Sequence, residues 1–328
     1  MKTLRPLVAA VFLFFFIPLT THAQQEVATA VALHGSLHVK GNRIVDSHGT
    51  AIQLRGMSFF WSQWMGQYFT SENVKWLKED WHCNVVRAVM GIEMGGYLDH
   101  PEREKEKIIA VVDEAIRQGI YVIIDWHDHR AQLHVKEAKA FFSEMAQRYG
   151  DKPNVIYELY NEPLNVSWST VIKPYHEAVI DTIRKYDADN LILCGTPNWS
   201  QDVDIAAHDP IKGTNIAYTL HFYANSHKES LRKKATQALN DGIALFVTEY
   251  GTTDASGNGF VNKEETRTWW KFMDDHKISW CNWSIADKNE SSSALKAGMQ
   301  INGKLSAAQL TESGNFVREE IRLKNPKH

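Results

Sequence analysis

The sequence predicts a (β/α)8 barrel, and three observations support this fold class. Eight short apolar runs recur along the chain, amphipathic stretches separate them, and no Gly-x-Gly-x-x-Gly loop follows the first run. Near-continuous apolar runs are typical of parallel strands covered on both faces, and their alternation with helices is the pattern of α/β folds. A doubly wound open sheet is the alternative, but it usually carries the glycine-rich loop. The barrel is therefore the favoured architecture.

The expected elements follow in chain order. Leu37–Val39 and Arg43–Val45, joined through Gly41-Asn42, predict a hairpin that could close the N-terminal end of the barrel. Helical periodicity is clearest in three stretches, and Gly119 and Gly150 stand where helix C-caps belong. The three stretches are Glu104–Gln118, Val135–Tyr149 and Tyr175–Tyr186. The predicted strands are Ile52–Ser58, Val85–Met90, Tyr121–Trp126, Val155–Tyr160, Leu191–Gly195, Ile216–Phe222, Ala244–Glu249 and Ile278–Trp283.

The first residues resemble an export signal. Lys2 and Arg5 precede an apolar run from Leu7 to Leu19, and Ala23 provides the small residue of a cleavage site. The run is too short to span a bilayer comfortably, which disfavours an uncleaved anchor. We therefore expect residues 1–23 to be a signal peptide, 24–34 an N-terminal segment and 35–328 the (β/α)8 barrel domain. The mature protein is expected to be extracellular, periplasmic or associated with the cell surface.

Composition excludes several classes of protein. With 44% hydrophobic and 23% charged residues the chain is an ordinary globular protein, and its net charge of −3 gives no reason to expect nucleic-acid or membrane binding. Only three cysteines are present, so a disulfide scaffold is excluded. Cys83, Cys194 and Cys281 each lie in or beside an apolar run, where we expect buried thiols. We expect a monomer.

Two carboxylates stand at predicted strand ends. Barrel enzymes carry their active sites at the C-terminal ends of the strands, and Glu162 and Glu249 end the fourth and seventh runs. Two carboxyl groups facing one cavity can cleave a glycosidic bond, because one protonates the leaving oxygen while the other attacks the anomeric carbon. The alternative for either residue alone is a structural ion pair with Arg87 or His221.

A metal site is the competing interpretation of these strand ends. Asp125-Trp126-His127-Asp128-His129 contains the His-x-His with which some metallohydrolases begin a metal site, and His221 could be a further ligand. The last two strand ends, however, supply Glu249 and Trp283 rather than a clear aspartate ligand. We therefore expect no metal and no cofactor, and interpret His127 as a hydrogen-bond donor to a sugar hydroxyl or a carboxylate.

The 11 tryptophans divide into two groups. Those in helical stretches are expected to pack in the core, namely Trp76, Trp81, Trp269 and Trp270. Those that follow or end a strand signal are expected to line the cleft, where indole can stack on the apolar face of a sugar ring; they are Trp64, Trp199 and Trp283.

At these residues the chain resembles the family 5 glycoside hydrolases, in particular bacterial endo-β-1,4-glucanases (cellulases). The resemblance covers residues 34–324 and rests on a set of motifs in a fixed order. They are Leu54-Arg55-Gly56-Met57-Ser58, Asn84-Val85-Val86-Arg87-Ala88, Tyr121–His127, Asn154–Glu158 followed by Asn161-Glu162-Pro163, Trp199-Ser200-Gln201-Asp202, His221-Phe222-Tyr223-Ala224, Thr248–Thr252 and Asn282-Trp283-Ser284.

The resemblance implies a retaining hydrolase in which Glu162 is the acid/base and Glu249 the nucleophile. It implies that Arg87 and Tyr223 hold the nucleophile and that Asn161 binds the 2-hydroxyl of the cleaved sugar. The remaining implied residues are two cleft histidines, His127 and His221, and substrate contacts. On the non-reducing side these contacts are Trp64, Trp283, Lys288 and Glu290; Trp199 lies on the leaving-group side, and Ala255 is a further contact.

The resemblance also implies how far apart the two carboxyl groups lie and how the pKa of Glu162 is shifted, and two positions differ from the family pattern. The carboxyl groups should lie about 5–5.5 Å apart, with the pKa of Glu162 raised by burial and by the charge of Glu249. Phe60 and Gly91 stand where close relatives often have histidine and tyrosine. The same machinery could act on mannan, xyloglucan or mixed-linkage glucan instead, or the chain could be an inactive glycan-binding barrel.

Overall fold

The computed structural model describes residues 2–4, 28–298 and 305–326. The predicted signal peptide therefore lies outside the described residues, apart from residues 2–4. Within the described ranges no helix combines the length and the apolar character that crossing a membrane requires.

Eight parallel strands close into a barrel, as the sequence predicts. Each of the eight apolar runs overlaps one strand, and the last strand pairs with the first to complete the ring. The (β/α)8 prediction is confirmed. The barrel strands are β3 (Arg55–Phe59), β4 (Val85–Gly91), β5 (Tyr121–His127), β6 (Val155–Glu158), β7 (Ile192–Cys194), β8 (Ile216–Tyr223), β9 (Leu245–Gly251) and β10 (Ser279–Ile285).

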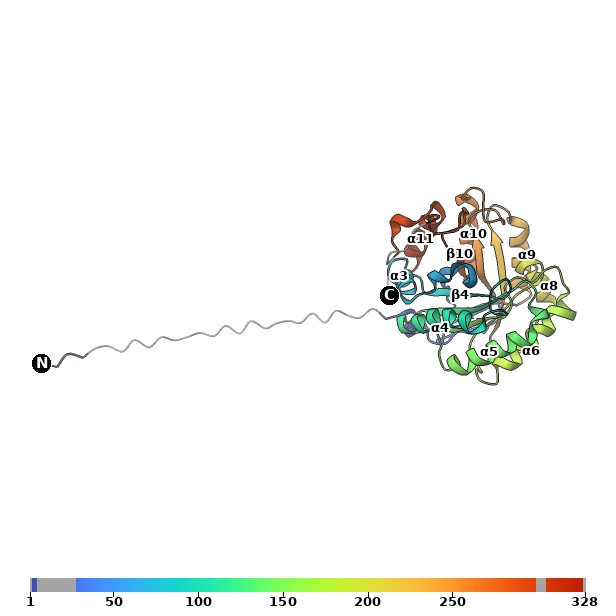
Figure 1. The fold of residues 1–328 in the computed structure, drawn as a ribbon, viewed down its shortest axis with the longest axis horizontal. Helices are drawn as coiled ribbons and strands as arrows, with labels where there is room; N and C mark the ends of the chain where they lie inside the picture. The colour runs from blue at the N-terminus through green and yellow to red at the C-terminus, as the bar shows by residue number, and fades with distance from the viewer. Residues whose placement is uncertain (1, 5–27, 299–304, 327–328) are drawn as a thin grey trace.

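Helices surround the barrel and fill the connections between successive strands (Figure 1). The C-terminal helix completes this ring beside α3, where Arg318 Nε lies 2.6 Å from Asp80 Oδ2. The helices are α1 (Ala30–His34), α2 (Ser62–Met65), α3 (Ser71–Glu79), α4 (Pro101–Gln118), α5 (Val135–Tyr149), α6 (Lys173–Ile183), α7 (Pro197–Ser200), α8 (Val203–His208), α9 (Glu229–Asn240), α10 (Lys263–His276) and α11 (Glu312–Lys324).

Both predicted glycine caps end their helices, for different physical reasons. Gly119 caps α4 with φ 66°, the left-handed region that favours glycine. Gly150 caps α5 with φ −64°, which any residue can adopt. At Gly150 an added Cβ would instead lie 2.8 Å from the carbonyl oxygen of Tyr186, so close packing of backbone requires the glycine.

The N-terminal hairpin packs against the closed end of the barrel. Strands β1 (His38–Lys40) and β2 (Arg43–Val45) pair antiparallel, as predicted. Leu37 and Ile44 are buried in one apolar cluster with the barrel residues Val85, Tyr121 and Phe246. These barrel residues lie at or near the starts of their strands, so the hairpin covers the N-terminal end.

The barrel interior changes from apolar to charged along the strands. On β5 the alternate residues Tyr121 and Ile123 belong to the apolar cluster at the closed end, and Asp125 and His127 continue the same face. Residues of the opposite face, such as Trp126, pack against the surrounding helices. This change places ionisable groups at the open, C-terminal end.

The three cysteines are buried free thiols, as expected.

Candidate active site

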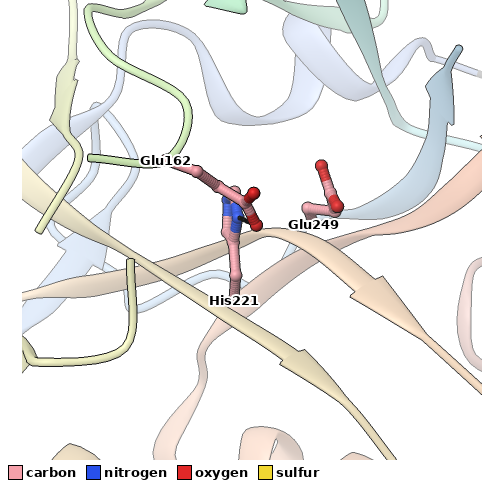
Figure 2. A group of neighbouring side chains, drawn as sticks. All are labelled: Glu162, His221 and Glu249. Atoms are coloured by element: carbon pink, nitrogen blue, oxygen red, sulfur yellow. Dashed lines mark hydrogen bonds and ion pairs between the residues drawn. The ribbon is translucent and has the colours of Figure 1, made fainter. Parts of the chain in front are cut away.

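Glu162, His221 and Glu249 converge at the C-terminal ends of the strands (Figure 2). His221 and Glu249 face each other in register on the adjacent strands β8 and β9. Glu162 follows β6, and its backbone N–H donates to the carbonyl of Asp128 at 3.3 Å, which draws it toward the end of β5. One side-chain nitrogen or oxygen atom of each of the three residues lies within 4.8 Å of the corresponding atoms of the other two.

Glu249 is held at both carboxylate oxygens. The Tyr223 hydroxyl donates to Oε1 at 2.9 Å, and Arg87 Nη1 donates to Oε2 at 3.1 Å. Both partners were predicted from the sequence. Burial raises the pKa of Glu249, the charge of Glu162 raises it further, and Arg87 and Tyr223 oppose that increase. The carboxylate is fixed in orientation and points into the open end of the barrel.

Arg87 connects Glu249 to two further buried carboxylates. Its guanidinium lies 2.7 Å from Glu158 and 3.0 Å from Asp125, and it donates to Asn161 Oδ1 at 2.6 Å. Sequence reasoning gave Glu158 and Asp125 no role. The available signal was a carboxylate inside each of two apolar strand runs, because an ionised group is rarely buried without a partner.

His127 is neutral and oriented by its neighbours. Its Nδ1–H donates to Asp125 at 2.7 Å, so its Nε2 accepts from the Asn161 amide at 3.4 Å. Burial lowers its pKa well below the usual histidine range, and the positive charge of Arg87 adds to this effect. The hydrogen bond to a carboxylate matches one of the two roles predicted for this residue.

Glu162 lies between two histidines. His221 Nδ1 is 3.0 Å from Oε1, and His129 Nε2 is 3.1 Å from Oε2. Burial favours a higher pKa, but the hydrogen bonds to His129 and His221 outweigh it and lower the pKa of Glu162 to about 2. The expectation of a raised pKa is wrong for the free protein, because the sequence did not reveal that two imidazoles contact this carboxylate.

His221 and Glu162 share one proton. Burial lowers the pKa of His221, but two nearby carboxylates outweigh it and raise the pKa to about 9: Glu158, 3.8 Å from Nε2, and Glu162, hydrogen-bonded to Nδ1. The Thr248 hydroxyl donates to Glu158 at 2.7 Å, so its oxygen accepts from His221 Nε2 at 2.8 Å. The other imidazole nitrogen of His221, Nδ1, is therefore the one that bonds to Glu162. The opposite shifts favour the ion pair in the free protein, with the proton on His221 and Glu162 ionised.

The possible metal ligands differ from those that the His-x-His motif indicates. Among the described residues, the donors close enough to share an ion are Glu162, His221 and Glu249. His127 and His129 are instead hydrogen-bonded to separate carboxylates, Asp125 and Glu162. The pair does not converge on one point, so the motif does not form the metal site of the competing interpretation.

A groove passes over the two carboxylates and continues on both sides of them. Its larger part is a cavity of about 490 Å³, which includes Trp199, His221, Ala255 and both catalytic candidates in its wall. The other part shares Glu162, Glu249 and Ala255. Its other walls include Trp64, His127, Trp283, Lys288 and Glu290. The structure therefore brings the predicted contacts Trp64, Trp199, Ala255, Trp283, Lys288 and Glu290 to this groove, whereas Asn161 is buried beneath it, bonded to Arg87 and His127.

The three predicted groove tryptophans differ in exposure. Trp64 is 48% exposed and Trp199 is 44% exposed, whereas Trp283 is only 5% exposed. Trp283 packs against Phe60 and stacks on His127 with ring centroids 5.4 Å apart. It contributes both to the groove wall and to the packing beneath it. Of the predicted core tryptophans, Trp81, Trp269 and Trp270 are buried and Trp76 packs against the core.

A left-handed turn presents Trp199. Asn198, Trp199 and Ser200 have φ of 57°, 57° and 55°, a conformation that non-glycine residues rarely adopt. The turn is held by bonds from the Trp199 N–H to the Pro163 carbonyl at 2.8 Å and from the Ser200 hydroxyl to the Asn161 carbonyl at 2.8 Å. Backbone strain of this kind is often found at functional sites.

Trp61 and His129 are among the groove residues to which sequence reasoning assigned no substrate or catalytic role. Trp61 lies edge-on to His127 with ring centroids 4.2 Å apart. Its signal was its place directly after the first strand end, beside Trp64. Of the two departures, Phe60 lines the groove, and Gly91 leaves room for Gln63, whose Oε1 would be 1.7 Å from an added Cβ.

Comparison with known proteins identifies the family. Residues 45–289 match the cellulase model of glycosyl hydrolase family 5. Endoglucanase Z of Dickeya dadantii is 54% identical over 289 residues, which are 87% of this chain and 66% of that protein. A solved structure from Cytophaga hutchinsonii is 57% identical, with a TM-score of 0.89, over 90% of this chain and 97% of that one.

A third relative has been solved with a sugar. It is a variant of the endoglucanase Cel5A catalytic domain of Thermobifida fusca in complex with cellotetraose, 34% identical, with a TM-score of 0.86. It is matched over 90% of this chain and 99% of its own. The chain thus belongs to glycosyl hydrolase family 5.

Proposed function

We propose that this protein is a retaining endo-β-1,4-glucanase that cleaves internal bonds of cellulose and related β-glucans. One observation carries the proposal: an oxygen of Glu162 and an oxygen of Glu249 lie within 4.8 Å of each other, and both residues line an open groove. Retaining glycosidases have carboxyl groups about 5–5.5 Å apart, whereas inverting enzymes leave about 6.5–9.5 Å for a water molecule. The short separation favours direct attack by one carboxylate.

Glu249 is the proposed nucleophile. Arg87 and Tyr223 stabilise its charge and aim it into the groove. Its carboxylate forms a bond to the anomeric carbon while the bond to the leaving oxygen breaks, and Glu162 gives a proton to that oxygen. Water then attacks the glycosyl-enzyme, Glu162 regains its proton from that water, and the bond to Glu249 breaks.

The proton for the first step is already present at the site. In the free protein it resides on His221, and Glu162 is ionised. A bound sugar excludes water from the carboxylate, which raises the cost of its charge and favours transfer of the proton to Glu162. His221 then becomes the neutral imidazole and continues to donate its other N–H to Thr248.

The groove supports a β-glucan substrate. Trp64 and Trp199 present indole surfaces on opposite sides of the carboxylates, an arrangement that suits the flat rings of a β-1,4-linked chain. The relative from Thermobifida fusca binds cellotetraose, a short chain of this type. Lys288 and Glu290 contact each other at 2.5 Å at the groove wall and offer polar contacts for hydroxyl groups.

We also propose that the protein acts as a monomer after export. The basic start, the apolar run and the small residues around Ala23 support export by cleavage of residues 1–23. Sizing the secreted protein and determining its N-terminal residue test both proposals.

Two glutamate variants test the chemistry. Glu249→Ala cannot form the glycosyl-enzyme, so turnover of every substrate should fall by at least about 10³-fold. Glu162→Ala should still form it from 2,4-dinitrophenyl β-cellobioside, whose leaving group needs no proton, and azide should then release β-cellobiosyl azide. An α-azide product from this variant would show that the two roles are reversed.

A substrate panel tests specificity. Carboxymethylcellulose, barley β-glucan, xyloglucan and mannan should be hydrolysed in parallel by the wild-type protein, with Glu249→Ala as the control for contaminating activity. We expect the first two to be cleaved fastest. Faster cleavage of mannan or xyloglucan would retain the mechanism but replace the substrate, and no cleavage of any of them would favour a glycan-binding role.

A further inference from the structure

His129 contacts the carboxyl group that the proposed mechanism uses as its acid. The imidazole Nε2 lies 3.1 Å from Glu162 Oε2, and His221 occupies the other oxygen. His129 follows the predicted strand Tyr121–Trp126 and has no role in the mechanism described so far. Each oxygen of Glu162 thus has its own histidine, and the two histidines have different surroundings.

The two histidines differ in their freedom to move. The His221 side chain is 2% exposed and its second nitrogen is bonded to Thr248. The His129 side chain is 37% exposed and lines the groove on both sides of the carboxylates. His129 is therefore the more exposed of the two, although both histidines line the larger part of the groove.

The fold fixes the position of His129 through its backbone and its neighbours. The Tyr160 hydroxyl lies 2.9 Å from the His129 carbonyl oxygen and 2.5 Å from Gln132 Oε1, and Tyr160 is fully buried. Asp128 accepts the Arg130 N–H at 2.8 Å and lies 2.7 Å from His134 Nδ1, so the residues on either side are also held. The ring itself lies edge-on to Trp61. This degree of support indicates a placed side chain rather than a surface histidine.

We propose that His129 is a positioning residue for the acid/base: its N–H bonds to Oε2 and holds the Glu162 carboxyl so that Oε1, which receives the proton from His221, is directed at the glycosidic oxygen when substrate binds. The inference rests on the proposed function of Glu162. Without His129, one oxygen of Glu162 loses its partner and the carboxyl can rotate about its last torsion. Misalignment of the acid slows protonation of the leaving oxygen but does not affect attack by Glu249.

The dependence on the leaving group tests this inference. His129→Ala should lower kcat/KM for cellotetraose by about 10–100-fold, a fraction of the full contribution of general acid catalysis. For 2,4-dinitrophenyl β-cellobioside, which needs no proton, the loss should stay below about 3-fold. His129→Gln places an amide N–H near the position of Nε2 and should restore cellotetraose cleavage to within about 5-fold of wild type.

Two controls complete the experiment. His208→Gln changes an exposed histidine on α8 outside the groove and should leave both substrates unaffected. Equal losses on both substrates in His129→Ala, or a glutamine variant no better than alanine, would overturn the inference. Failure of the proposed function is distinguishable, because Glu162→Ala would then show no selective loss on cellotetraose.

Discussion

At the scale of single residues, the proton shared by Glu162 and His221 governs how activity should depend on pH. The reaction needs this proton and also needs Glu249 as the free carboxylate. The pKa of Glu249 is raised above its usual value of 4.5, so the rate should fall as the pH decreases through that raised pKa. The pair loses its proton near the His221 pKa of about 9, so the rate should fall again as the pH rises toward that value.

This bell-shaped dependence can be measured as kcat/KM on cellotetraose from about pH 4 to about pH 10 at constant ionic strength. The dinitrophenyl cellobioside is the matched control, because its leaving group departs without protonation. With that substrate the acidic limb should remain and the basic limb should disappear. A basic limb common to both substrates would assign it to some other group, such as one needed for binding.

At the scale of elements, the groove tryptophans belong to differently packed parts of the molecule. Trp64 lies on the short helix α2 and is half exposed, whereas Trp283 lies on the barrel strand β10 and is nearly buried. Both were expected from the sequence to line the cleft, where indole can stack on a sugar ring. For Trp283 the structure adds a packing role, because Phe60 and His127 pack against its ring.

Alanine variants should separate these two situations. Trp64→Ala should lower kcat/KM by roughly 3–10-fold, which corresponds to the loss of one stacking contact with the sugar. The free energy of unfolding should fall by less than about 1 kcal/mol, because the side chain is half exposed. Trp283→Ala should lower activity and also destabilise the protein by about 3–5 kcal/mol. Urea unfolding and cellotetraose kinetics measure both quantities.

A buried tryptophan outside the groove is the control for this pair. Trp270 on α10 is 3% exposed and stacks on Trp280, so Trp270→Ala should destabilise the protein while the folded fraction keeps its turnover. A Trp283 variant that is as stable as wild type would contradict our account of its packing.

The fold could be predicted from the sequence because the burial of each strand is visible in its own residues. A strand of a closed parallel barrel is covered on both faces, so each run was apolar enough to be found without knowledge of its partners. The strand ends were equally accessible, which is why Glu162 and Glu249 were identified. The contacts of the site were not: Glu158 is four residues before Glu162 in sequence, but its role depends on Arg87 from another strand.

His129 illustrates the same limit. Its sequence position suggested a metal motif with His127, whereas the loop after β5 carries it to Glu162. The direction of the Glu162 pKa shift depends on that contact. Distances between side chains from different strands are set by register and loop geometry, which no local pattern records.

At the scale of the whole molecule, the form of the groove decides how a polymer is attacked. The carboxylates lie between two contiguous parts of the groove, one with Trp199 in its wall and the other with Trp64, so sugar contacts are available on both sides of the bond that is cut. A chain can therefore be bound along its length rather than by its end, and the groove favours cleavage at internal bonds.

We expect random internal cleavage to lower the viscosity of soluble carboxymethylcellulose rapidly while few reducing ends are formed, because each early cut halves long chains on average. Viscosity and reducing ends should be measured on the same samples, with Glu249→Ala as the inactive control and acid-hydrolysed polymer as the calibration for random scission. The enzyme should follow the calibration curve in the early reaction. Steady release of cellobiose with almost unchanged viscosity would show attack at chain ends, and the open groove would then not determine the mode of action.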